Sequence, residues 1–170
     1  PISTATIPPA EILEAAYPVA FRQWALRSDS AGAGMHRGGL GAVYEIELLE
    51  EQAEAFLFGE RGRFAPQGIH GGGEAAKNHF TYQTDEGWDE PALTSKMVGI
   101  PLKRGQRVRL ETPGGGGYGQ PEDRAPDAVA RDVALGFLSE TLADQTYGPA
   151  WREAAPKDDG IGRASCRGRG

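Results

Sequence analysis

Apolar and polar residues alternate along several short stretches of the chain, which is typical of β-strands with one buried face. The clearest stretch covers residues 43–50, "VYEIELLE", where Tyr44, Ile46 and Leu48 share one side. Similar alternation occupies residues 54–61, 78–84 and 106–112. Residues 21–27, "FRQWALR", also fit a strand, although both faces carry large apolar groups. These five segments predict a mainly β fold, either a sandwich or a partly open barrel.

Two segments with helical spacing flank these strands. Residues 9–16, "PAEILEAA", begin with a proline, which favours the first turn of a helix. Residues 125–143 carry one apolar stripe at helical intervals, formed by Val129, Val133, Phe137 and Leu138. We therefore expect a short N-terminal helix and a longer C-terminal helix, from about residue 126 to residue 143, that packs on the β-structure.

Length and composition favour one domain followed by a tail. A chain of 170 residues is long enough to bury a real core. After Tyr147 the apolar pattern fades, so we expect a β-rich domain over residues 1–148 and a mobile tail over residues 149–170. The chain begins at Pro1 instead of methionine, which suggests a piece of a longer protein.

Charge and cysteine content limit the partners and the compartment. The net charge of −6 disfavours nucleic acid, whose phosphate backbone is polyanionic. No apolar run reaches the roughly 18–20 residues of a membrane span, and no signal peptide is visible. Cys166 is the only cysteine, so an internal disulfide is impossible and a reducing compartment fits best. We expect a cytoplasmic protein that binds neither nucleic acid nor membrane.

The 25 glycines come in bursts, and the last burst, "GGGGYG" at residues 114–119, contains the G-x-G-x-x-G spacing of dinucleotide-binding loops. That motif needs a helix at its last glycine and then another parallel strand, whereas Pro121 and Pro126 delay the helix and no strand follows. No Lys-Ser or Lys-Thr pair follows either, which disfavours a Walker loop. Two explanations stay open: another segment passes close to the bare backbone, or several N–H groups face an anion.

Histidines and an arginine lie beside the glycines. His36 and His70 occupy similar loops, "GMHRGG" and "GIHGGG", and are weak candidates for a shared metal site if folding gathers them. Neither they nor His79 shows the local spacing of a metal site, so solvated loop histidines are the simpler interpretation and no metal is predicted. Arg37 either forms an ordinary surface ion pair or, if it points inward, holds a carboxylate or phosphate by a bidentate fork.

Other candidates for chemistry have simpler explanations. Ser30 lacks the G-x-S-x-G frame of a nucleophile elbow, and both Asp29 and Ser30 fit a turn or a cap. Glu111 and Asp123 flank the tetraglycine run and could form a proton-transfer pair. A strand-end glutamate and a helix-capping aspartate are the simpler explanation, so the catalytic residues stay unassigned.

Four blocks of sequence stand out together, "PPAEILEAAYPV", "LRSDSAGAGMHRGGLGAVYEIELLE", "RGRFAPQGIHGGG" and, most specific of all, "LETPGGGGYGQP". In this order they resemble the C-terminal portion of the hydantoinase B/oxoprolinase family. That family contains the B-type subunits or halves of N-methylhydantoinases, 5-oxoprolinases, and acetone and acetophenone carboxylases. The likeness covers about residues 5–148 and departs from the family pattern at Gln120, where the family usually has aspartate.

The resemblance implies that the chain is part of an ATP-dependent cyclic-amide hydrolase of the N-methylhydantoinase or 5-oxoprolinase type. ATP and Mg would be bound by an A-type partner subunit, in a hetero-oligomer that also contains the remainder of the B-type subunit. This region would shape a substrate or subunit interface through the loops that contain Arg37, Gly38, Gly39, Gly114, Gly115, Gly116, Gly117, Tyr118 and Gly119.

Two other functions stay open. The chain could be a non-catalytic scaffold domain of a ketone carboxylase complex, on which the ATP-binding subunit docks. It could also be a free-standing β module that binds a small ligand.

Overall fold

The computed structural model describes residues 8–155. Its strands are β1 (Val19–Arg27), β2 (Gly41–Leu48), β3 (Gln52–Phe58), β4 (His79–Thr84), β5 (Gly87–Asp89), β6 (Lys96–Lys103) and β7 (Arg107–Glu111). Its helices are α1 (Ala10–Ala16), the 3-10 helix η1 (Pro121–Asp123), α2 (Pro126–Ala134), α3 (Glu140–Tyr147) and α4 (Trp151–Ala154). None of the helices in this part of the chain is long and apolar enough to cross a membrane.

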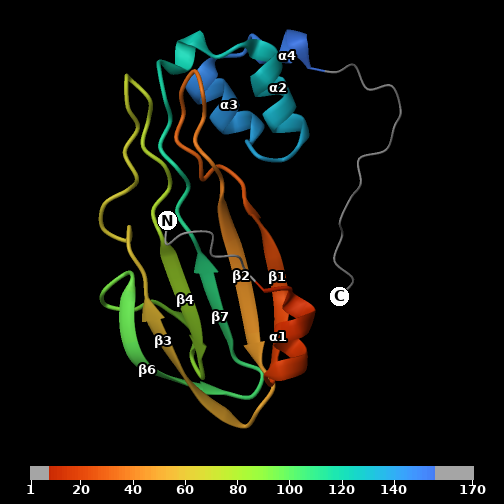
Figure 1. Cartoon of the computed structure of the whole chain (residues 1–170), viewed down its shortest axis with the longest axis vertical. Coiled ribbons are helices and arrows are strands. Elements are labelled where there is room, and N and C mark those ends of the chain that lie inside the picture. Colours follow the sequence, from red (N-terminus) through yellow and green to blue (C-terminus); the bar gives the residue numbers. More distant parts are fainter. Residues whose placement is uncertain (1–7, 156–170) are drawn as a thin grey trace.

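The fold is mainly β, as expected. A five-stranded antiparallel sheet has the order β1-β2-β7-β4-β5, and β3 pairs with β6 in a second antiparallel sheet (Figure 1). All five predicted strands are present, and β5 and β6 are additional. Gly99 and Pro101 lie inside β6 and hide it from propensity-based prediction, because both residues are unfavourable in strands.

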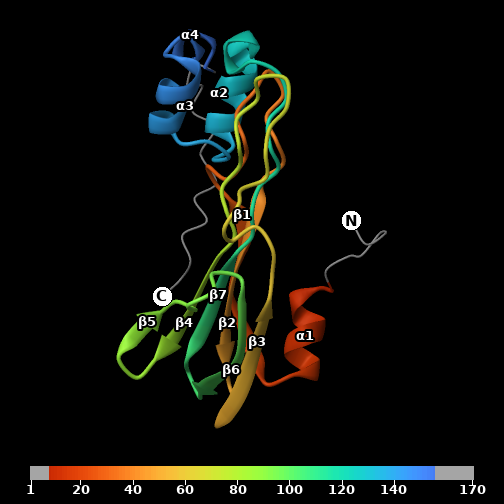
Figure 2. The ribbon, with the colours of Figure 1, turned by 90° about the vertical axis from the view of Figure 1, so that its left-hand side faces the viewer.

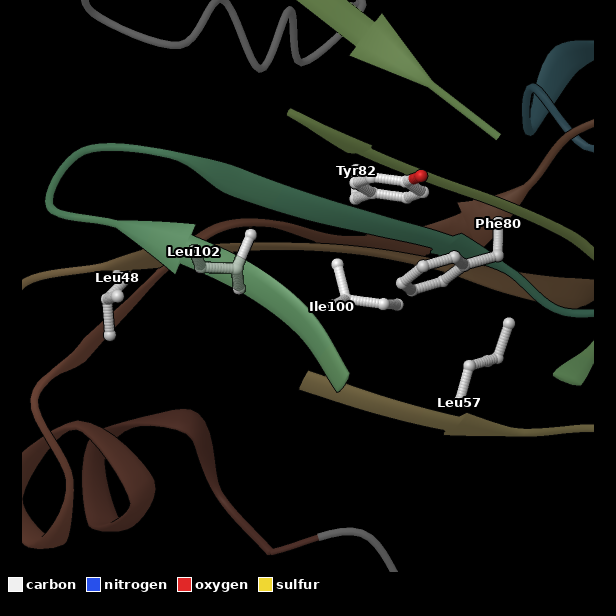
Figure 3. Close-up of a cluster of buried hydrophobic side chains, with 6 residues drawn as sticks. All are labelled: Leu48, Leu57, Phe80, Tyr82, Ile100 and Leu102. Atoms are coloured by element: carbon white, nitrogen blue, oxygen red, sulfur yellow. The ribbon is translucent and has the colours of Figure 1, made fainter. Parts of the chain in front are cut away.

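The two sheets face each other across an apolar cluster, which we call the side-chain core (Figure 3). Ile100 of β6 has no exposed surface and lies at its centre, with Leu57 of β3 on the same sheet. The five-stranded sheet contributes Leu48 of β2 together with Phe80 and Tyr82 of β4. The alternation predicted in β2 is therefore real, and its apolar side turns toward the second sheet.

The ambiguity in the first strand is resolved by a β-bulge. Phe21 pairs with Ile46, but the next paired residue is Gln23, so Arg22 is the extra residue. The bulge shifts the alternation by one position. Phe21 and Trp24 therefore lie on the same face of the sheet, whereas strict alternation would place them on opposite faces.

Charged side chains form a continuous row on the opposite face of the five-stranded sheet. Its ion pairs, between 2.9 and 3.2 Å, link Arg22, Glu47, Arg107, Glu45, Arg109, Glu111 and Arg27 in that order. The hydrogen bond from Arg22 is the main cause that lowers the pKa of Glu47, and Arg107 lowers it further. Partial burial opposes both effects.

The predicted long C-terminal helix is wrong in one respect, because the structure divides it into α2 and α3. Gly136 has a φ of 73°, which lies in the left-handed region that ends helices. Ser139 then caps α3, since its side chain accepts a hydrogen bond from the Leu142 N–H at 3.2 Å. A single apolar stripe can continue across such a break, which is why periodicity alone did not reveal it.

The helices pack into a second, smaller core at the far end of the molecule from β3 and β6 (Figure 1). It contains Val129 and Ala130 of α2, Ala143 of α3 and Trp151 of α4. Residues 149–155, which we assigned to a tail, thus include a short helix and a buried tryptophan. The rest of that predicted tail, with Cys166, lies outside the described residues.

Candidate functional site: the glycine core

Three glycine-rich segments run side by side between the sheets and helices α2, α3 and α4, which we call the helical end, as both views of the ribbon show (Figure 1, Figure 2). We call them segment 1 (residues 30–41), segment 2 (residues 65–76) and segment 3 (residues 113–120), and together the glycine core. Segment 1 joins β1 to β2, segment 2 lies between β3 and β4, and segment 3 leads from β7 to η1. The bursts of glycine that are separate in the sequence therefore meet in space.

Each segment is hydrogen-bonded to both of the others through the main chain. Segments 1 and 3 exchange bonds between His36 and Tyr118, at 3.0 and 2.9 Å. Segment 3 reaches segment 2 through Gly117, whose N–H donates to the Gly73 oxygen at 3.0 Å. Segments 1 and 2 meet where the Gly73 N–H donates to the Ala33 oxygen at 2.7 Å. Because all three pairs are bonded, the segments form a bundle and not a flat sheet.

The bundle leaves no room for side chains at its centre. A Cβ atom on Gly114, Gly116 or Gly117 would overlap main-chain atoms of Ser30, Gln67 or Ala33, respectively. Further positions are blocked in the same way, by main-chain atoms of a neighbouring segment, at Gly32, Gly34, Gly38 and Gly72. Main-chain atoms that are themselves hydrogen-bonded cannot move aside cheaply, so glycine is required at these positions.

Of the two explanations for the tetraglycine run, close backbone approach is therefore the observed one. Gly114 to Gly117 do not have φ values in the left-handed region, so steric space and not unusual torsion angles explains them. The N–H groups of Gly115, Gly117 and Gly119 donate to oxygens of Gly39, Gly73 and Ile69. These donors are consumed inside the chain and do not face an anion.

Not every glycine among the predicted site residues is sterically required. A Cβ on Gly39 would meet nothing within 4 Å, and one on Gly115 would come no closer than 3.2 Å to a neighbour, the Gly39 nitrogen. Gly119 has a φ of 74°, so it favours glycine for its backbone conformation. The glycine core thus contains positions at which a substitution can serve as a control for the sterically blocked ones.

The structure brings His36 and His70 to the same aromatic ring. The Tyr118 ring centroid lies 6.1 Å from that of His36 and 5.2 Å from that of His70. All three side chains are exposed at the surface of the bundle. Within residues 8–155 no group of three or more His, Cys, Asp or Glu side chains gathers as a metal site would require. His79 is separate and contacts Glu90 at 3.0 Å.

Arg37 points inward and holds a carboxylate, which belongs to its own chain. Its Nε lies 2.8 Å from Asp132 Oδ2, and its guanidinium stacks over Phe137. Arg124 Nη2 lies 2.7 Å from the same oxygen of Asp132. Asp132 is only 5% exposed, so this shared ion pair joins segment 1 to helix α2.

Neither Asp132 nor Arg124 is among the site residues predicted from the sequence. The available signal was a polar residue, Asp132, next to Val133 and three positions after Val129 on the apolar stripe of α2. A buried aspartate needs a cationic partner, which pointed to an arginine elsewhere in the chain. The partners could not be chosen without the fold, because Arg37 lies 95 residues from Asp132 and Arg124 lies outside helix α2.

The remaining candidates act as structural anchors. The fully buried Ser30 hydroxyl donates to the Arg27 oxygen at 2.6 Å and accepts from the Gly41 N–H at 2.9 Å. Asp29 Oδ1 accepts from the Ser139 N–H at 2.7 Å and so fixes the start of α3. Glu111 belongs to the charged row, whereas Asp123 lies in η1 at the other end of segment 3. The structure does not bring Glu111 and Asp123 together as an acid–base pair.

Comparison with known proteins identifies similar chains. Residues 1–121 match the sequence profile of the family described as hydantoinase B/oxoprolinase. The chain is 29% identical over 140 residues to the B-type subunit of a D-/L-hydantoinase from Pseudomonas sp. (strain NS671), with 82% of this chain and 24% of that protein covered.

Two solved structures are also similar. The ATP-dependent caprolactamase from Pseudomonas jessenii superposes with a TM-score of 0.68 at 30% identity and covers 92% of this chain and 26% of its own. The nucleotide-free structure of acetone carboxylase superposes with a TM-score of 0.74 at 21% identity, over 85% of this chain and 23% of its own, which is a likeness of fold. The chain thus spans about a quarter of the length of each of these three relatives.

Proposed function

The chain belongs to the hydantoinase B/oxoprolinase family, and from that premise we propose that it is the C-terminal portion of a B-type subunit in an ATP-dependent enzyme that opens cyclic amides. In this proposal the glycine core is a rigid spacer that holds the helical end at a fixed place and shapes a substrate or subunit interface. The role proposed for the glycine core rests on the observation that a Cβ on Gly117 would overlap the Ala33 carbonyl.

Sequence identity favours a cyclic amide over a ketone as substrate. The relatives whose names refer to hydantoin or caprolactam hydrolysis are 29% and 30% identical to the chain. Acetone carboxylase is 21% identical, which supports a shared fold only. A ketone carboxylase complex stays the second candidate, because the fold is shared and a fold alone does not decide the substrate.

ATP does not fit the glycine core. A phosphate cradle needs several N–H groups that point at the ligand, whereas Gly115, Gly117 and Gly119 donate to carbonyls of the chain itself. We therefore place ATP and Mg on an A-type partner subunit and assign this chain no step in phosphoryl transfer. The relative from Pseudomonas sp. (strain NS671) is itself named as one subunit of a hydantoinase, which supports a partner of this kind.

The substrate class is tested with the full-length subunit, produced together with the ATP-binding subunit. ADP release is measured with hydantoin, 5-oxoproline and caprolactam, and separately with acetone plus bicarbonate. We expect ADP release to depend on one of the cyclic amides and ring opening to accompany it. ADP release that requires acetone and bicarbonate, with none of the amides active, would assign the chain to a carboxylase instead.

The role of this region is tested with Arg37→Ala in the same complex. Because Arg37 binds Asp132 within the chain, we expect the assembled fraction on gel filtration to fall and the residual activity to fall in proportion. Arg131→Ala is the matched control, since Arg131 and Arg37 line one pocket beside helix α2 and Arg131 has no acidic partner among the described residues. A loss of turnover in a fully assembled Arg37→Ala complex would show that Arg37 contributes to the reaction itself.

A further inference from the structure

A second candidate site lies away from the glycine core, in a groove beside the two-stranded sheet. The groove has a volume of about 910 Å³, which is within the range of about 300–1,000 Å³ that is usual for small-molecule clefts. One wall is formed by residues 59–64, which follow β3, and the other by residues 92–96, which lead into β6. Lys77, shortly before β4, completes the lining.

The groove gathers cations that no acidic side chain of residues 8–155 pairs with. Most Lys and Arg side chains between residues 8 and 155 form an ion pair with an acidic side chain, and the exceptions within that range are Arg61, Arg63, Lys77 and Arg131. The first three of these all line the groove. Such a concentration of unpaired positive charge is unexpected in a chain with a net charge of −6.

Apolar groups lie between these cations. Phe64 and Leu93 line the groove and are each 69% exposed, which is unusual for large apolar side chains beside a cleft. The Arg63 guanidinium lies over the Phe64 ring at 5.3 Å, so one cation is already held at the apolar surface. The combination suits a ligand that is partly anionic and partly apolar.

The frame of the groove is fixed by hydrogen bonds. The Gly59 N–H donates to the Ser95 oxygen at 2.7 Å, and Asn78 Nδ2, which is buried, donates to the Ser95 hydroxyl at 3.1 Å. A Cβ on Gly62 would overlap the hydroxyl oxygens of Thr94 and Ser95, so the two walls touch at that point.

Arg61 lies in this frame with a strained backbone. Its φ is 65°, in the left-handed region that costs a non-glycine residue energy, and its carbonyl accepts from the Asn78 N–H at 3.0 Å. Strain of this kind persists where neighbouring contacts determine the conformation, as they do here. The backbone is thus held in place while the guanidinium stays available for a ligand.

We propose that this groove is a binding site for an organic carboxylate with an apolar body. A guanidinium fork of Arg61 or Arg63 binds the carboxylate, Lys77 adds positive charge, and Phe64 and Leu93 cover the apolar part. The site does not depend on the proposed function, since none of these residues belongs to the glycine core.

The test uses the whole 170-residue chain, labelled with ¹⁵N, and follows amide shifts during titration. Benzoate is the probe, benzamide is its uncharged match, and inorganic phosphate is an anion without an apolar body. We expect saturable shifts at residues 61–64 and 93–95 with benzoate and binding about tenfold or more weaker with benzamide, because the carboxylate charge is lost. Added salt should weaken benzoate binding.

Variants identify the residues responsible. Arg63→Gln and Arg61→Asn should each weaken benzoate binding roughly three- to fivefold, and asparagine tolerates the left-handed backbone at position 61. Arg131→Gln should leave the affinity unchanged, because Arg131 lies outside the groove although it too has no acidic partner within residues 8–155. Thermal unfolding of each variant verifies that it is folded before titration.

Several results would overturn the proposal. They are the absence of saturable shifts with benzoate, equal affinity for benzamide or phosphate, and equal weakening by Arg131→Gln. Binding of an acidic peptide such as acetyl-Glu-Phe-Glu-amide without binding of benzoate would assign the groove to a protein partner instead.

Discussion

In the side-chain core, Ile100 fills the space between two sheets, whereas in the glycine core Gly117 lies against the Ala33 carbonyl with no space for even a methyl group. The first region is stabilised by burial of apolar side chains, and the second by main-chain packing and hydrogen bonds between three segments. The two regions should therefore respond in opposite ways to substitution. Removing atoms damages the first, and adding atoms damages the second.

The largest effect is expected from Gly117→Ala. The added methyl group would meet hydrogen-bonded main chain, so the free energy of unfolding should fall by about 4 kcal/mol or folding should fail altogether. Gly39→Ala is the control, because a Cβ there meets nothing within 4 Å, and its stability should stay within about 0.5 kcal/mol of the wild type. Urea denaturation measures both. Equal stability of the two variants would refute the steric account of the glycine core.

Ile100→Ala should have the next largest effect. The substitution opens a cavity between the sheets, and the free energy of unfolding should fall by about 3 kcal/mol. Val98→Ala, in the same strand at an exposed position, should change it by less than about 0.5 kcal/mol. If the two alanine variants unfolded at the same urea concentration, the side-chain core would not be where the structure places it.

Asp132→Asn tests the link between the glycine core and the helical end. It removes the charge shared by Arg37 and Arg124, and both arginines would lose their charged partner in a partly buried place. We expect a loss of about 2 kcal/mol in the free energy of unfolding. Asp127→Asn, at an exposed position of the same helix, should cost far less, and a similar cost for both would argue against the shared ion pair.

The smallest effect concerns the charged row on the sheet and depends on pH. The pKa of Glu47 is lowered in the folded chain, so this carboxylate stabilises the fold above its unfolded pKa of about 4.3. That contribution is lost as the pH falls through the lower, folded value. Between pH 7 and pH 3 the melting temperature should therefore fall less steeply for Glu47→Gln than for the wild type. Parallel curves would mean that Glu47 contributes nothing to the pH dependence of stability. Glu54→Gln, at an exposed position of β3, serves as the control.

Most of the β-structure follows from local pattern, because alternation reports the buried face directly. The exceptions have identifiable causes. The bulge at Arg22 interrupts the period of two, and Gly99 and Pro101 conceal β6. Gly136 divides a helical stripe that looks continuous in the sequence.

The site could be predicted only in part. The composition of residues 114–119 indicates that side chains are excluded there, but it does not indicate which segments exclude them. The partners Ser30, Ala33 and Gln67 lie far away in the sequence, and their residue types do not mark them as partners. The role of Arg37 likewise depends on Asp132, which lies 95 residues away. Contacts of this kind come from tertiary structure, and no local pattern encodes them.

Native-state hydrogen exchange tests the central claim most directly, since it measures whether the glycine core is ordered by its own backbone bonds. The account predicts that the amides of Gly115, Gly117, Tyr118 and Gly119 exchange as slowly as those of strands β2 and β7, although these four residues lie outside the strands. Exchange of these amides at the rate of an exposed loop would contradict it.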